Sequence, residues 1–144
     1  MATINQFEDL TIWQEAKKLN VIIFKLTNSG NFKNHDHLRI QMERSAGSVM
    51  DNIAEGFERG GNKELIQFLY FSKGSCGELR SQLYRSYDYS LISDEELKTC
   101  IEICRHVSVK IFAFINYLKK SVYKGDKYNI SEPEGIYNNN NANL

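Results

Sequence analysis

Apolar and small residues recur at intervals of three and four in four separate segments of the chain, which is the spacing that lines one side of an α-helix. The four stripes are Ile12, Ala16, Leu19, Ile23 and Leu26; Leu38, Met42, Ser45, Val49, Ile53 and Gly56; Leu65, Leu69, Ser72, Cys76, Leu79 and Leu83; and Ile101, Cys104, Ser108, Ile111, Ile115 and Leu118. None of these segments shows the alternation of a half-buried strand. The pattern predicts an all-α protein with four amphipathic helices.

Residues that break or begin helices lie between the stripes. Asn28, Ser29 and Gly30 follow the first stripe, and Gly60 and Gly61 follow the second. We expect side-chain caps from Thr11 with Gln14, from Asp36, from Asn62, and from Ser93 with Glu96. Because connections of a few residues force consecutive helices to run antiparallel, residues 1–120 are predicted to form one up-down four-helix bundle.

The end of the chain, residues 121–144, has a different composition from the helices before it. Residues 131–135 read Ser-Glu-Pro-Glu-Gly, and residues 138–141 are all asparagine. Proline cannot continue a helix, and a run of one polar residue has no apolar surface to bury. We interpret residues 121–144 as a flexible, low-complexity and disordered tail.

Composition places the protein in a reducing, aqueous compartment. No run of 18 or more apolar residues is present, and the first residues lack the basic start and apolar stretch of a secretory signal. The three cysteines Cys76, Cys100 and Cys104 are an odd number without a paired framework. We therefore expect a cytoplasmic protein without disulfides or a membrane span.

The fourth helix carries more apolar residues than one core stripe requires. The additional row is Ile103, Val107, Phe114 and Tyr117. It either thickens the core of the monomer, as aromatic residues often do, or forms a contact between subunits. We favour the subunit interface, and we expect the small residues around Gly74 and Gly77 to mark the close approach of a neighbouring helix.

No arrangement of residues suggests catalysis or a metal site. The three histidines, His35, His37 and His106, lack the Glu-x-x-His spacing of a di-iron bundle. Cys100 and Cys104 are four residues apart, but Cys104 lies on a core stripe, so buried structural thiols explain these cysteines better than zinc ligands do. We expect no enzymatic activity, no catalytic residue, no metal and no cofactor.

Two groups of polar residues are candidates for binding. Arg44, Asn52, Glu55 and Arg59 share one face of the second helix, either as a solvated face or as an interaction site. On the third helix the candidates for nucleic-acid contact are Lys63, Lys73, Arg80 and Arg85, beside Tyr84 and Tyr87, which either stack on bases or pack. However, the 18 basic and 18 acidic residues cancel, so strong binding of a polyanion is not expected from one subunit.

The order of these residues resembles a known bacterial family. The chain shows F-x-x-L-x-x-W-x-x-A at residues 7–16, then Gln41, Arg44, Ala46 and Ser48, then N-I-A-E-G-x-x-R at 52–59, and then F-L, G-S-x-x-E-L and Q-L between residues 68 and 83. This pattern is similar to that of the four-helix-bundle proteins encoded in intervening sequences of 23S rRNA genes. The resemblance implies a homopentamer. It also extends in fold to the accessory variability determinant, which works beside a reverse transcriptase.

Two functions follow as hypotheses. The first is a non-catalytic, homo-oligomeric interaction module that uses the row Arg44, Asn52, Glu55 and Arg59. The second is an accessory protein that binds RNA or a nucleic-acid enzyme, in which a ring of subunits repeats a modest positive charge so that affinity rises by avidity.

Overall fold

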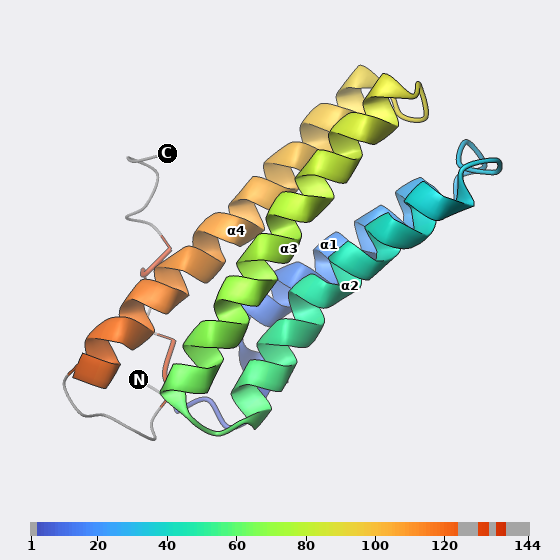
Figure 1. Ribbon diagram of the computed structural model, residues 1–144. Coiled ribbons are helices and arrows are strands. Elements are labelled where there is room, and N and C mark those ends of the chain that lie inside the picture. The colour runs from blue at the N-terminus through green and yellow to red at the C-terminus, as the bar shows by residue number, and fades with distance from the viewer. Residues whose placement is uncertain (1–2, 124–129, 133–134, 138–144) are drawn as a thin grey trace.

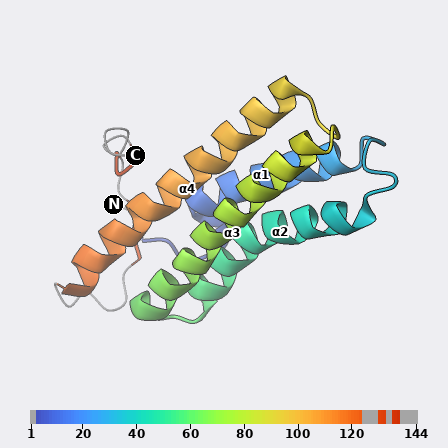
Figure 2. The same cartoon turned by 45° about the horizontal axis from the view of Figure 1, so that its top comes forward.

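The computed structural model describes residues 3–123, 130–132 and 135–137, and its helices confirm the predicted all-α bundle. A short 3-10 helix, η1 (Phe7–Asp9), precedes four α-helices. These are α1 (Thr11–Thr27), α2 (Asp36–Glu58), α3 (Asn62–Asp88) and α4 (Asp94–Tyr123). Consecutive helices run antiparallel and lie side by side, and α1 also contacts α4 (Figures 1 and 2).

The four predicted stripes form the core. Every residue in them is buried except Ser108, which is half-buried. Each helix buries its stripe against two neighbouring helices, and this packing forms the bundle. The buried hydroxyl of Ser72 on α3 donates to the main-chain carbonyl of Val49 on α2 over 2.6 Å, whereas the buried side-chain oxygen of Gln82 has no hydrogen-bond partner among the described residues.

Glycine explains the approach of α2 and α3, although not at the predicted positions. A Cβ atom added to Gly56 would lie 2.6 Å from the Cβ of Phe68, so α3 packs directly on the α2 backbone at this point. A Cβ atom added to Gly74 or Gly77 would meet nothing within 4 Å. The prediction that these two glycines mark a close helix approach is therefore wrong within the chain.

Of the four predicted caps, the one at α4 is confirmed. The Ser93 amide donates to the Glu96 carboxylate over 2.9 Å, and the Glu96 amide donates to the Ser93 hydroxyl over 3.1 Å. At the other three starts Leu10, His35 and Gly61 occupy the cap position, and none of them makes a side-chain cap bond. Thr11, Asp36 and Asn62 are instead the first residues of their helices.

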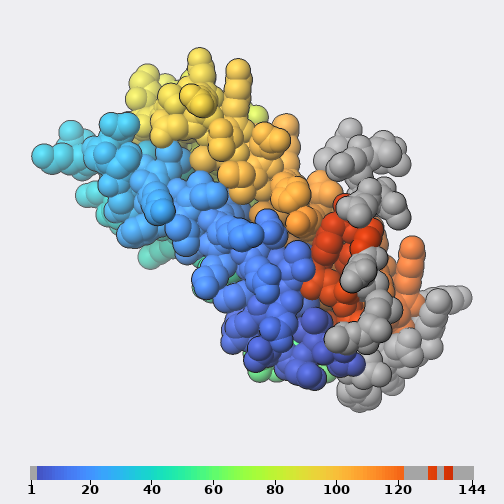
Figure 3. All heavy atoms as spheres, turned by 180° about the vertical axis from the view of Figure 1, so that it is seen from behind, coloured from blue at the N-terminus to red at the C-terminus, as the bar shows by residue number. Residues whose placement is uncertain are grey.

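The start of α1 is capped from the other end of the sequence. The Thr11 amide donates to the Glu132 carboxylate over 2.8 Å, and the Ile4 amide donates to the Ile130 carbonyl over 2.9 Å. We call residues 130–132 and 135–137 the C-terminal segment. Figure 3 shows it in red, packed between the N-terminal residues and α4.

This packing changes the interpretation of the predicted tail. Ile130, Ile136 and Tyr137 are partly buried against the core, so the described residues of the C-terminal segment belong to the folded body. Helix α4 also continues to Tyr123, beyond the predicted boundary at residue 120. The rest of the predicted tail, 124–129, 133–134 and 138–144, lies outside the described residues.

Candidate interaction surfaces

The predicted polar row on α2 is exposed except for the half-buried Asn52, and part of it is ordered by hydrogen bonds. The Asn52 amide donates over 2.8 Å to both the carbonyl and the hydroxyl oxygen of Ser48, whose hydroxyl also accepts from Ser75 on α3 over 3.0 Å. Arg59 pairs with Glu55 over 2.8 Å one turn before it. Arg44 is exposed and has no carboxylate within 4.0 Å among the described residues.

A shallow hollow of about 670 Å³ follows this face of α2. We call it the α2 hollow; its lining residues are Ile40, Glu43, Arg44, Gly47, Ser48, Asp51, Asn52 and Glu55. It exists because Gly47 and Ser48 are small and lie between longer side chains on the same helical face. Three of the four predicted interaction residues line it, and Arg59 lies one turn beyond Glu55.

Apolar side chains border the α2 hollow. Ile40 lines it directly, and Phe24 of α1 is 57% exposed. Phe24 lies on one helical row with Asn20, whose amide oxygen lies beside Gly47, and with Asn28, which donates to Glu43 over 2.8 Å. The two α2 residues at the ends of this row, Gly47 and Glu43, line the hollow, so we infer that Phe24 lies at its margin.

The second apolar row of α4 does not face outward as predicted. Val107 and Phe114 are buried inside the chain, while Ile103 and Tyr117 are half-buried. The C-terminal segment packs over this side of α4: the Tyr117 and Ser131 hydroxyls are 2.5 Å apart, and Lys110 lies over the Tyr137 ring. The prediction that this row forms an exposed subunit contact is therefore wrong for Val107 and Phe114. These two residues thicken the monomer core instead.

The four predicted nucleic-acid residues of α3 do not form one patch. Arg85 turns toward α2 and donates to Gln41 over 3.1 Å, and Lys63 is exposed at the start of α3. Lys73 and Arg80 line another hollow, of about 410 Å³, between α3 and α4. We call it the α3–α4 hollow; Arg105, Ser108 and Val109 of α4 complete its lining.

Arg105 and Ser108 were missed by the sequence interpretation. Arg105 lies on no apolar stripe, and Ser108 was counted in the core. The antiparallel pairing of α3 with α4 would have been the only signal, because it brings residues about 30 positions apart to the same level of the bundle.

The thiols are buried and unpaired. Burial raises the pKa of the Cys76 thiol to about 12, although the Arg80 guanidinium acts in the opposite direction. Burial likewise raises the pKa of Cys104 to about 12, and that of Cys100. Across the described residues, no three histidine, cysteine or acidic side chains gather in a way that would hold a metal ion. A protonated thiol is a poor metal ligand and a poor nucleophile.

No helix of the described residues has both the length and the apolar character to cross a membrane. The protein is a small antiparallel helical bundle, and its surface includes a hollow along α2 and another between α3 and α4.

Comparison with known proteins places this bundle in a family. The family model described as 23S rRNA-intervening sequence protein matches residues 8–113, so the chain belongs to that family. A crystal structure from Bacteroides thetaiotaomicron, described as a protein with unknown function from the S23 ribosomal protein family, has a similar fold. Its TM-score is 0.67 at 16% sequence identity, covering 73% of this chain and 98% of that one. No protein of curated function matches significantly.

Proposed function

We propose that the protein is a non-catalytic interaction module that assembles with copies of itself through the α2 hollow and its apolar margin. One observation carries this proposal. The surface combines a hollow, the charge of Arg44 without an ion-pair partner among the described residues, and exposed apolar side chains on adjacent helices. An apolar patch with a polar surround is the usual mark of a protein–protein contact.

The polar residues of this surface are not needed for the core. Arg44, Glu55 and Arg59 are exposed, and the Glu55–Arg59 pair lies on the surface, where such a pair contributes at most about 1 kcal/mol to stability. Arg59 also lies over the Phe68 ring of α3, 5.3 Å from its centroid, so Arg44 is the residue that folding accounts for least. A role in contacting another molecule would account for Arg44.

A second copy of the chain is the partner that the surface fits best. The α2 hollow carries both signs of charge, from Arg44 and from Glu43, Asp51 and Glu55. A surface of both signs is complementary to itself, and the zero net charge of the chain adds no repulsion between copies. Five subunits is the number that the family resemblance implies.

The proposal is tested by light scattering on purified variants. Phe24→Ser removes the apolar margin, Arg44→Glu reverses an exposed charge, and Glu55→Ala with Arg59→Ala removes the ion pair. Each is expected to shift the protein toward the monomer while helical circular dichroism is retained. Tyr89→Ser is the matched control, since Tyr89 is 52% exposed, close to the 57% of Phe24, but lies beyond the end of α3. Assembly that survives all three changes would contradict the proposal.

A further inference from the structure

The α3–α4 hollow gathers positive charge without a counter-charge. Lys73, Arg80 and Arg105 reach it from two helices, and none of them has a carboxylate within 4.0 Å among the described residues. Ser108 adds a hydroxyl group to the lining. Guanidinium, ammonium and hydroxyl donors together are the usual set that binds a phosphate group.

One of these donors is both buried and unsatisfied. The Nε atom of Arg80 is inaccessible to solvent, and no hydrogen-bond acceptor lies within reach of it in the part of the chain that the structure describes. Leaving a charged, buried N–H group unpaired is unfavourable, so such a group calls for an acceptor that the described residues do not provide. Because the Arg80 side chain lines the hollow, a rotation of this side chain would present the N–H group to an anion bound there.

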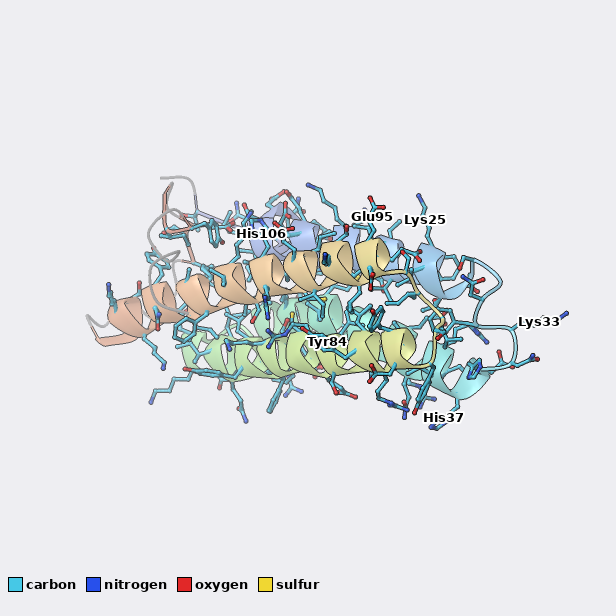
Figure 4. All side chains as sticks on the ribbon, turned by 90° about the horizontal axis from the view of Figure 1, so that it is seen from above. Lys25, Lys33, His37, Tyr84, Glu95 and His106 are labelled. Atoms are coloured by element: carbon cyan, nitrogen blue, oxygen red, sulfur yellow. The ribbon has the colours of Figure 1, made fainter. Side chains whose placement is uncertain are left out.

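A second, more apolar hollow of about 380 Å³ adjoins the first, because Arg105 lines both. Tyr84, Leu97 and Ile101 supply its apolar surface, and Lys98 and Glu102 supply polar groups at its edge. Tyr84 is 47% exposed. It lies on α3 beside α4 (Figure 4). An exposed ring next to a cationic hollow suits the flat face of a nucleobase.

Gly77 keeps space open between the cations of α3. Lys73, Gly77, Arg80 and Tyr84 share one helical row, with Gly77 between the two cations. A Cβ atom at Gly77 would meet nothing within 4 Å, so packing inside the chain does not require a glycine here. A glycine in a helix interior costs about 1 kcal/mol relative to alanine, which is explained if a ligand occupies this space.

From these observations we infer a nucleotide-binding site on the outer side of α3 and α4. The phosphate lies between Lys73, Arg80 and Arg105, and the base lies against Tyr84. The ligand is a free nucleotide or one unit of a single strand, since both present a phosphate next to a flat ring. The site is separate from the α2 hollow, so the two proposals stand or fall independently.

The test uses the full chain and three probes: inorganic phosphate, adenosine monophosphate and a short labelled single-stranded RNA. Binding is measured by calorimetry for the first two and by fluorescence anisotropy for the third. Arg105→Ala and Lys73→Ala are expected to weaken nucleotide binding by about tenfold or more. Lys63→Ala, an exposed cation of α3 outside the hollow, is expected to change it little. Arg80 is left unchanged because its side chain is partly buried.

Two further variants leave the charge of the protein unchanged. They test the contact with the base and the space for the ligand separately from the contacts with the phosphate. Tyr84→Ala should weaken the nucleotide while leaving phosphate binding unchanged, with Tyr89→Ala as its control. Gly77→Leu should fill the space and block the nucleotide, whereas Gly74→Leu on the neighbouring face should not.

The outcome identifies the source of the ligand. Binding of the mononucleotide assigns a free nucleotide, and binding of RNA alone, lost in Arg105→Ala, assigns a strand; either supports the site. Failure of all three probes to bind, or binding that Arg105→Ala, Tyr84→Ala and Gly77→Leu all leave intact, would overturn it.

Discussion

Gly56 of α2 lies against Phe68 of α3 so closely that a Cβ atom at Gly56 would be 2.6 Å from the Phe68 Cβ and 3.3 Å from the Leu65 Cα. We predict that Gly56→Ala destabilises the protein by roughly 1–3 kcal/mol, because the two helix backbones must separate to admit the methyl group. Urea unfolding followed by circular dichroism measures this change.

The matched control for this prediction is Gly74→Ala. A Cβ atom there meets nothing within 4 Å, so the higher helix propensity of alanine should stabilise the protein by up to about 1 kcal/mol. Equal effects of the two substitutions would show that the contact at Gly56 is not as tight as described.

Glu132 ties the C-terminal segment to the start of α1. Its carboxylate accepts from the Thr11 amide over 2.8 Å and also from the Tyr137 hydroxyl. A negative side chain at a helix N-terminus both satisfies a free amide and interacts with the helix dipole. We predict that Glu132→Ala lowers the free energy of unfolding by about 1 kcal/mol and raises amide exchange at Thr11.

Glu132→Gln separates the two contributions, since the amide oxygen still accepts a hydrogen bond but carries no charge. A loss smaller than that of Glu132→Ala is expected. Thr11 exchange that is unchanged in Glu132→Ala would show that the C-terminal segment does not cap α1 in solution.

The buried thiols make stability depend on pH in alkaline solution. The pKa of Cys76 and of Cys104 is raised by burial from 9.0 to about 12. Below pH 9 both thiols are protonated in the folded and the unfolded chain, so their contribution is constant. Above pH 9 the unfolded chain loses these protons first, and stability falls until the folded thiols ionise near pH 12.

At pH 10 the predicted loss is roughly 1 kcal/mol per thiol. It is measured as the difference between the native protein and a Cys76→Ala, Cys104→Ala variant, in which the titration of other groups cancels. A difference that stays constant from pH 8 to pH 10 would show that these thiols are accessible to water.

Local patterns were enough to predict the helices. The stripe from Ile12 to Leu26 depends only on the 3.6-residue period, and the Ser93–Glu96 cap depends on residues three positions apart. The stripe and the cap could be predicted because the residues that form the buried side and the start of a helix are close together in the sequence.

Contacts between distant residues were not predictable in this way. Glu132 caps Thr11 across 121 positions, and the segment around it helps to cover the side of α4 that holds Phe114. Apolar periodicity shows that Phe114 is buried but does not show what covers it, and the sequence interpretation therefore favoured a neighbouring subunit where the chain itself provides the cover. Likewise, the α3–α4 hollow needs Arg80 and Arg105 at one level, which follows only from helix pairing.

The proposed assembly is tested most directly by native mass spectrometry of the unmodified protein, with Phe24→Ser measured beside it. One chain has a mass of 16.7 kDa. The account predicts a single assembly of several chains, five by family resemblance, which Phe24→Ser converts largely to the 16.7 kDa monomer. A native protein that stays monomeric as its concentration is raised, or an assembly unaffected by Phe24→Ser, would contradict the claim that the α2 hollow and its margin join subunits.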